Sequence, residues 1–483
     1  MKKNNVYKNM TLNIMRTMLS IAFPLISYPY ATRVLQVENY GKVSFSQSIV
    51  SYISLIAALG ISTYAIREGG IYRNNKRQLE RFCGEIFAIN IFSTIFAYII
   101  LIIFLLFSPT LQKNLLLILV FSLTVMLTTL SVDWINIIFE DYIFITLRSF
   151  LIQCISLFLL FIIVKTKDDY YNYAFLQVVN VGLIAISNFF HVRKLCRIRF
   201  TYKLNLNRHI KSIMILFSNS LAVSIYLNID NVLLGFMKGD CHVGLYSVSV
   251  KIYSILKQLV AAIYNVTITR MTDYLTLGRT DEYKKLLNNV VNKIIFGAIP
   301  ITAGIVCTSE EIIRVVAGEE YIGATTSLKI LALAILFAVL GGALASCVNL
   351  PNKEEIKNLK GTIWSAIINL FLNFIAIPII GIEGAAITTL IAEIFVCFYL
   401  WATMGELKEF FDIRSMKENI AKSILGILPI FIFRIIFVNI LNFKGIFYLG
   451  GMAVLSVLTY VSIELILKNS NMIVIVNKIK DKG

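Results

Sequence analysis

The chain has 483 residues, of which 58% are hydrophobic and only 15% are charged. Soluble domains carry roughly 25% charged residues, so this composition excludes an ordinary soluble globular protein and places most of the chain in lipid. The formal net charge of +17 lies mostly between the apolar runs, where basic residues set membrane topology and contact anionic lipid. It gives no reason to propose a nucleic-acid partner.

Apolar runs long enough to cross a bilayer follow one another along the whole chain. About 20 residues at 1.5 Å per residue match the hydrocarbon thickness of a membrane. We therefore predict an all-α integral membrane protein with about 14 transmembrane helices. The predicted spans are 10–32, 43–66, 83–107, 115–138, 143–164, 172–191, 211–236, 243–269, 290–308, 325–349, 358–379, 382–404, 419–438 and 445–467. The first run is long and lacks a small-residue cleavage site, so no cleavable signal peptide is expected.

Basic residues fall in alternate loops, which predicts the orientation of the chain. The N-terminus, the loop after the second span and the segment 193–211 are rich in Lys and Arg, whereas the opposite loops hold few. Both termini are expected in the cytoplasm. The long basic segment is the natural boundary between two halves. The predicted domains are a six-helix bundle at 1–192, a cytoplasmic linker at 193–210, a second six-helix bundle at 211–405, and two additional transmembrane helices with a cytoplasmic tail at 406–483.

The second predicted span carries a row of small polar residues three and four positions apart: Ser44, Gln47, Ser48, Ser51 and Ser54. On a helix these residues share one face. A polar face within a membrane span must contact protein or water rather than lipid. Two interpretations stay open, a helix–helix contact made by small residues and the lining of a polar cavity.

The second half of the chain repeats this pattern. The segment GKVSFS at 41–46 is echoed by GLYSVS at 244–249, and the register continues through the span, so that Arg67 corresponds to Arg270. In this register Ser44, Ser48 and Ser51 correspond to Ser247, Lys251 and Ser254. We interpret the chain as two related six-helix bundles followed by a C-terminal helical pair. An even number of spans per half makes the repeat parallel, and in such folds the substrate lies between the halves near the membrane midplane.

Several short motifs resemble one known family. They are YATRVL at 30–35, YG at 40–41, LGI at 59–61 and YAIRE at 64–68, followed in the second half by IDNVLLG at 229–235 and VGLYS at 243–247. This set resembles the bacterial polysaccharide repeat-unit (oligosaccharide-lipid) flippases of the multidrug/oligosaccharidyl-lipid/polysaccharide exporter superfamily. The resemblance extends over essentially the full chain. One departure is Gln36, where relatives usually have glycine.

The resemblance implies two six-helix bundles around a central cavity and transport by alternating access. The implied substrate is an undecaprenyl-pyrophosphate-linked oligosaccharide repeat unit, moved from the cytoplasmic to the outer leaflet of the bacterial plasma (inner) membrane. The implied role is biosynthesis of a cell-surface polysaccharide (capsule, O-antigen or exopolysaccharide), with other polysaccharide assembly proteins as further partners. The alternatives are a lipid II flippase, which resembles the chain in its fourteen spans, and a cation-coupled multidrug exporter of the same superfamily. The exporter's cavity would favour carboxylates, and the deep charges here are mainly basic.

Deep basic residues fit a pyrophosphate substrate, because a diphosphate in a low-dielectric environment needs compensating cations. An intramembrane Lys or Arg costs about 2.5–3.5 kcal/mol on insertion scales, so a buried one suggests a function. Lys251, mid-span on one face with Ser247, Ser254 and Gln258, is the main candidate. Lys257 is as deep but lies to one side of that face.

Other basic residues have alternative explanations. Arg16 shares a face with polar residues but is also positioned to snorkel to the cytoplasm, as is Arg148. Arg33, Arg67 and Arg270 lie at span ends, where helix termination, anionic lipid and a cavity mouth are all open roles. The predicted substrate-binding set is Arg16, Ser44, Ser48, Ser51, Ser247, Lys251, Ser254, Lys257 and Gln258, with Arg33, Arg67 and Arg270 at the cavity mouth.

One polar group suggests coupling to an ion. Asp230 together with Asn369, Asn373 and Thr388 resembles an oxygen-rich cation site of the lipid II flippases, and oxygen ligands suit hard cations. Sodium or a proton is the expected coupling ion, and polar helix packing is the alternative. No cofactor and no protein-bound metal are otherwise predicted.

Enzymatic functions are poorly supported by the sequence, and no catalytic residue is predicted. The seven cysteines form neither a disulfide framework nor a C-x-x-C pair. The three histidines, His191, His209 and His242, are expected in loops where they form no site. A repeat-unit polymerase would bring a large catalytic external loop, and a glycosyltransferase would bring a domain with clustered carboxylates. The sequence has neither feature.

Overall fold

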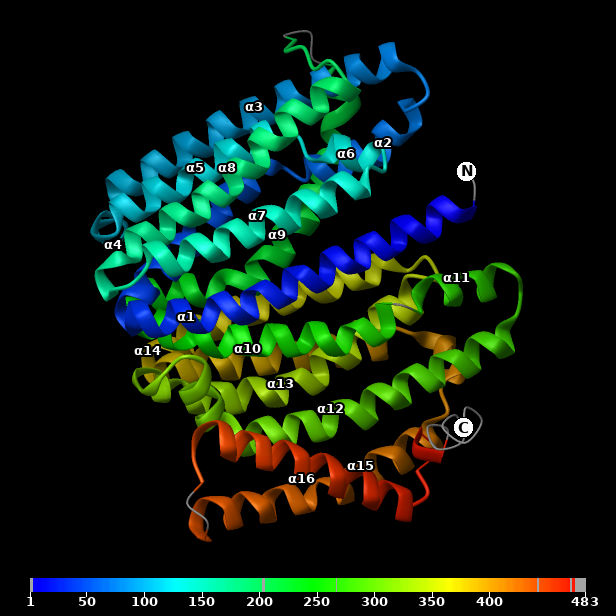
Figure 1. The fold of residues 1–483 in the computed structure, drawn as a ribbon. Helices are drawn as coiled ribbons and strands as arrows, with labels where there is room; N and C mark the ends of the chain where they lie inside the picture. Colours follow the sequence, from blue (N-terminus) through cyan, green and yellow to red (C-terminus); the bar gives the residue numbers. More distant parts are fainter. Residues whose placement is uncertain (1–2, 202–204, 266, 441–442, 470, 474–483) are drawn as a thin grey trace. The chain divides into compact units, whose positions relative to one another are not determined.

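The computed structural model is helical nearly throughout, and no strand occurs in the part of the chain that it describes (Figure 1). It describes all residues except 1–2, 202–204, 266, 441–442, 470 and 474–483. For residues 3–14, 16–21, 207 and 265 it describes the backbone but not the side chain. The chain divides into two compact units, Met1–Gly244 and Leu245–Gly483. The boundaries predicted for the linker and the bundles stay predictions.

The first unit begins with a long helix that is broken once. Its helices are α1 (Lys3–Ala58), α2 (Ile61–Tyr72), α3 (Lys76–Phe107), α4 (Pro109–Lys113), α5 (Leu115–Ser131), α6 (Trp134–Ile138), α7 (Tyr142–Ile163), η1 (Lys167–Asp169), α8 (Tyr170–Leu195), α9 (Leu206–Met237) and the first turn of α10 (Asp240–Asn265). Helix α1 packs along α3, α5, α7 and α9. Near the start of α3, buried side chains such as Ile61, Phe82 and Trp134 form a core that joins α2, α3 and α6.

Two residues divide helices that would otherwise be continuous. Gln36 has φ 61° and ψ 173°, which separates α1 into two segments. Gly381 has φ 60° and does the same for α14 (Glu355–Ala402) in the second unit. The described residues contain twelve helical candidates for membrane spans, and two of these hold both segments of a broken helix. The predicted all-α, multi-pass membrane fold with about 14 helices is therefore confirmed.

The second predicted span ends earlier than expected. Helix α1 stops at Ala58, and α2 begins at Ile61 after Leu59 and Gly60 adopt positive φ values of 44° and 70°. A Cβ at Gly60 would lie 3.0 Å from the backbone of Leu216 on α9. This left-handed turn favours glycine and lets the chain change direction beside α9.

The repeated glycines of the sequence face each other within the first unit. A Cβ at Gly41 on α1 would lie 1.9 Å from the carbonyl oxygen of Asp240, and one at Gly244 would lie 2.1 Å from the carbonyl oxygen of Val37. Any side chain at either position would collide with the backbone of the other helix. Both positions therefore require glycine for the same contact, which explains why the motif carries glycine in both halves.

The second unit is organised around one central helix. It continues α10 from Leu245 and adds α11 (Ile268–Thr276), α12 (Thr280–Val316), η2 (Glu319–Ala324), α13 (Thr325–Ala343), η3 (Leu344–Asn349), α14, η4 (Gly405–Phe410), α15 (Ile413–Ile435), η5 (Ile436–Ile440) and α16 (Gly445–Ile466). Helix α12 packs against α13, α15 and α16 (Figure 1). The Tyr448 hydroxyl donates to the carbonyl of Cys307 at 3.2 Å, and the Tyr460 hydroxyl donates to that of Phe296 at 2.8 Å. The C-terminal helical pair is therefore fixed to α12.

Candidate functional site

Serine hydroxyls of the polar row on α1 form hydrogen bonds within their own helix. Ser44 and Ser48 are buried and Ser51 is half-buried. The hydroxyl of Ser48 donates to the carbonyl of Ser44 at 2.8 Å, and that of Ser51 donates to the carbonyl of Ser48 at 2.7 Å. These hydroxyl protons are thus bound to backbone oxygens, a common pattern for helical serines. The neighbouring Gln47 is exposed and donates to the side-chain oxygen of Gln177 at 3.2 Å.

The corresponding row of α10 is more polar. Lys251 and Ser254 are half-buried in the middle of the helix, and Gln258 is exposed at its later part. Ser247 is buried, and its hydroxyl has no hydrogen-bond partner among the described residues. Because these positions are three and four residues apart, they share one face. The predicted binding residues of α10 thus form one continuous row with a cation near its centre.

Lys257 on the same helix is paired with a carboxylate. Its ammonium nitrogen lies 2.6 Å from a carboxylate oxygen of Glu393 on α14, and the Tyr253 hydroxyl donates to the same oxygen at 2.5 Å. Glu393 is buried, with 4% of the residue exposed. This ion pair was not predicted from the sequence. The pairing offsets the charge of Lys257, whose role as a substrate ligand stays a prediction.

Three of the four predicted coupling residues meet within α14. Asn369 and Asn373 precede the break at Gly381, Thr388 follows it, and all three are buried. The Asn373 amide donates to the side-chain oxygen of Asn369 at 3.0 Å, and the Thr388 hydroxyl donates to that of Asn373 at 2.6 Å. The Asn369 side-chain nitrogen is buried without a hydrogen-bond partner among the described residues.

The remaining predicted residues lie elsewhere. Asp230 is buried on α9 in the first unit, close enough to Tyr52 for an electrostatic interaction. That it acts together with Asn369, Asn373 and Thr388 (the Asn369 group) stays a prediction. Arg33, Arg67 and Arg270 are exposed, and Arg67 pairs with Glu68 at 3.1 Å. The side chain of Arg16 lies outside the described residues.

One ion pair corrects the expectation for Arg148. This arginine was expected to snorkel to the membrane surface, but only 6% of the residue is exposed. Its guanidinium lies 3.0 Å from a carboxylate oxygen of Asp133 and also donates to the side-chain oxygen of Asn188. Asn188 in turn donates to the Ser131 hydroxyl at 2.7 Å. Opposite charges in neighbouring spans were the sequence signal for this network, since a buried charge is retained mainly when it is paired.

The prediction that the three histidines lie in loops was wrong. His191 lies in α8, His209 in α9 and His242 in the first turn of α10. His209 is fully buried, with the Tyr64 hydroxyl 2.7 Å from Nδ1 and a carboxylate oxygen of Glu85 3.0 Å from Nε2. The ring therefore links the beginning of α9 to α2 and α3. For His209 the error arose because α9 begins at Leu206, inside a strongly basic segment whose composition is typical of a loop.

The chain is similar to known membrane transporters. A family model described as "Polysaccharide biosynthesis protein" matches residues 6–275. A protein of Escherichia coli (strain K12) named as an O-antigen transporter is 25% identical over 380 residues, which are 77% of this chain and 89% of that protein.

Two solved structures resemble the fold. One, the lipid II flippase MurJ in an inward closed conformation, aligns with a TM-score of 0.75 at 15% identity, covering 95% of this chain and 98% of that one. The other, an inward-facing multidrug resistance MATE family transporter of the MOP superfamily, aligns with a TM-score of 0.60 at 14% identity, covering 82% and 99%. At these identities the likeness concerns the fold alone.

Proposed function

Because the chain belongs to the polysaccharide biosynthesis protein family, a family of polysaccharide flippases, we propose that it translocates undecaprenyl-pyrophosphate-linked oligosaccharide repeat units. Transport runs from the cytoplasmic to the outer leaflet of a bacterial plasma membrane by alternating access. The product supplies a cell-surface polysaccharide such as a capsule, an O-antigen or an exopolysaccharide. Both termini lie in the cytoplasm in this proposal, and the protein carries its substrate without changing it covalently.

The observation that carries the proposal is the position of Lys251. It is half-buried at the middle of α10, with Ser247 and Ser254 one turn away on either side. A cation flanked by hydroxyl groups suits a phosphate ester, because charge-assisted hydrogen bonds to phosphate are stronger than neutral ones. An ammonium in a spanning helix is costly to insert, so its retention favours a role in transport.

The alternatives are less well supported. A cation-coupled multidrug exporter would favour carboxylates in its cavity, and two of the few carboxylates in the spans, Glu393 and Asp133, are paired with basic side chains. A lipid II flippase shares the pyrophosphate and the fold but carries a different glycan. The similarity to an O-antigen transporter over 77% of the chain favours a polysaccharide repeat unit.

The coupling part of the proposal concerns the Asn369 group. We assign Asn369, Asn373 and Thr388 to the uptake of sodium or a proton during the transport cycle, and we expect Asp230 to take part in the same coupling. The side-chain nitrogen of Asn369, which lacks a hydrogen-bond partner in the described part of the chain, supports a polar function here. The side-chain oxygens of Asn369, Asn373 and Thr388 are of the kind that hard cations prefer as ligands.

The test of the proposed function is chemical. Cells lacking the protein should accumulate undecaprenyl-linked oligosaccharide on the cytoplasmic leaflet, and the accumulated glycan should match the repeat unit of the missing surface polymer. Leaflet exposure is measured with a membrane-impermeant glycan-modifying enzyme added to inverted and right-side-out vesicles. Accumulation of lipid II instead would favour the peptidoglycan precursor as the substrate. Unchanged levels of both lipids would refute the proposed function.

A further inference from the structure

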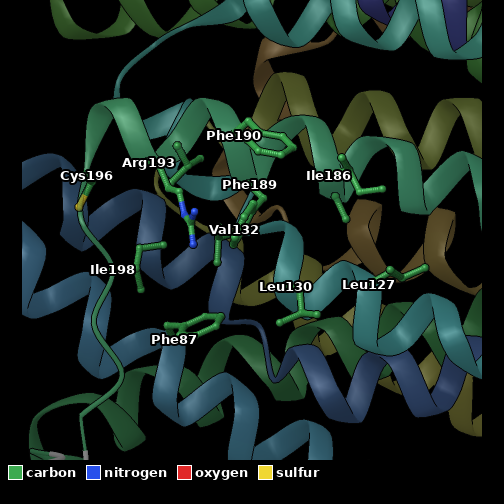
Figure 2. Close-up of a pocket in the computed structure, with 12 residues that line it drawn as sticks. Phe87, Leu127, Leu130, Val132, Ile186, Phe189, Phe190, Arg193, Cys196 and Ile198 are labelled. Atoms are coloured by element: carbon green, nitrogen blue, oxygen red, sulfur yellow. The ribbon is translucent and has the colours of Figure 1, made fainter.

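An apolar groove opens on the first unit where α5 and α8 lie side by side (Figures 1 and 2). Its volume is about 500 Å³, within the usual range of small-molecule sites. Helix α3 contributes Phe87, α5 contributes Leu127 and Leu130, and α8 contributes Ile186 and both Phe189 and Phe190. The exposed fractions of Ile186 and Phe190, 55% and 63%, open this lining to the surroundings of the helices.

One end of the groove carries a positive charge. Arg193 is the charged member of the twelve lining residues, and Figure 2 shows its guanidinium extending into the groove between Val132 and Ile198. Its guanidinium carbon lies 3.8 Å from the centroid of the Phe189 ring. Among the described residues Arg193 forms no ion pair, so its charge remains available to a ligand.

The groove lies at the boundary of the predicted membrane region. Helix α5 ends at Ser131 and α8 ends at Leu195, and both ends contribute to the lining near Arg193. Beyond them, Lys194, Arg197 and Arg199 are exposed. Apolar side chains therefore extend from the helix ends into the spans, while positive charge gathers at the level where lipid head groups lie.

We propose that this groove binds an anionic phospholipid of the bilayer, with the phosphate on Arg193 and one acyl chain between α5 and α8. Basic pockets between transmembrane helices bind anionic head groups, and a Lys or Arg near the surface contributes about 1 kcal/mol to that attraction. The apolar lining accommodates a hydrocarbon chain. It offers no row of hydroxyl or amide groups for a glycan, which favours a phospholipid over the transported lipid-linked oligosaccharide.

The test uses the full-length protein in nanodiscs that contain phosphatidylcholine and a trace of phosphatidylglycerol with a photoreactive acyl chain. Crosslinks should map to Leu130, Ile186 or Phe190, and unlabelled phosphatidylglycerol should compete better than phosphatidylcholine. The variant Arg193→Gln should weaken labelling about fivefold, the change expected for one surface cation. The matched control is Arg197→Gln, which removes an equal charge from the same segment but lies outside the groove lining.

A second variant separates lipid binding from a folding defect. Ile186→Trp fills the apolar part and leaves Arg193 in place, so it should also reduce labelling while the protein keeps its elution profile. The proposal is overturned if Arg193→Gln behaves like Arg197→Gln, or if phosphatidylcholine competes equally well. It is also overturned if undecaprenyl-pyrophosphate displaces the probe at far lower concentration than phosphatidylglycerol. The proposed transport function is measured separately, by glycan-lipid translocation, and survives each of these outcomes.

Discussion

The serine row of α1 and the corresponding row of α10 start from related sequences and differ in chemistry. In α1 the hydroxyl protons of Ser48 and Ser51 are bound to backbone carbonyls of their own helix. In α10 the position that corresponds to Ser48 is Lys251, and the hydroxyl of Ser247 has no hydrogen-bond partner among the described residues. From this comparison we propose that the polar row serves packing in the first unit and that its counterpart in the second unit supplies the positive charge for the substrate.

The largest expected effect is on Lys251. Lys251→Ala should lower polysaccharide export roughly tenfold to a hundredfold, the range for losing a hydrogen bond to a charged group. Lys251→Arg should keep part of the activity, and Ser48→Ala, at the corresponding position of α1, should export nearly normally. Surface polysaccharide is measured in complemented cells with matched amounts of protein in the membrane. Equal losses in Lys251→Ala and Ser48→Ala would remove the distinction between the two rows.

The second effect separates the two lysines of α10. Glu393→Gln leaves the ammonium of Lys257 without its carboxylate, and removing one partner of a buried pair costs about 3–5 kcal/mol. The side chain of Lys257 is 27% exposed, so we expect a smaller loss of about 2 kcal/mol, seen as a lower unfolding temperature in detergent. The double variant Glu393→Gln/Lys257→Met should recover most of it. A double variant no more stable than Glu393→Gln would show that the pair is not the source of the effect.

The third prediction concerns the role of Asp230 and Asn373 in ion coupling. Asp230→Asn should slow transport about tenfold and remove most of its dependence on a pH or sodium gradient, because a neutral amide does not exchange a proton or attract a cation as a carboxylate does. Substrate binding should change little. Asn373→Ala should give a milder form of the same change. Transport rates are compared at several imposed gradients, and full gradient dependence in Asp230→Asn would leave this residue with a packing role only.

The smallest expected effect is at the break in α1. Gln36 adopts φ 61° and ψ 173°, a region that is favourable for glycine and costs other residues about 1–3 kcal/mol. Gln36→Gly should raise stability by about 1 kcal/mol, since the greater flexibility of glycine offsets part of the gain. Glu38→Gly, two residues later in a helical position, should lower stability by about 1 kcal/mol. Thermal unfolding of both variants tests the sign of each change in stability. A destabilised Gln36→Gly variant would argue against backbone strain at Gln36.

The fold could be predicted from the sequence because the length of an apolar run directly indicates whether a helix can cross a membrane. Runs of about 20 residues predicted the helices, even where the breaks at Gln36 and Gly381 fall between neighbouring runs. In the sequence, Gln36 is a departure from the glycine expected there, and its positive φ is a conformation that glycine adopts more readily than glutamine.

The contacts of the site were less predictable. Residue spacing placed Ser247, Lys251 and Ser254 on one face, because the spacing of residues in a helix determines which side chains point the same way. It did not pair Lys257 with Glu393, 136 residues apart, or His209 with Glu85, 124 residues apart. Such pairs depend on how helices pack, which periodicity alone does not encode.

Translocation by the purified, reconstituted protein is the decisive measurement for the role of Lys251. Purified protein in liposomes is supplied with a fluorescent undecaprenyl-pyrophosphate-linked oligosaccharide, and loss of signal to an impermeant quencher reports the lipid reaching the accessible leaflet. We predict fast translocation by the wild type and by Ser48→Ala, slow translocation by Lys251→Ala, and no acceleration for undecaprenol that lacks the pyrophosphate. Translocation of the pyrophosphate lipid by Lys251→Ala at the wild-type rate would contradict the central claim that the α10 row carries the charge for substrate.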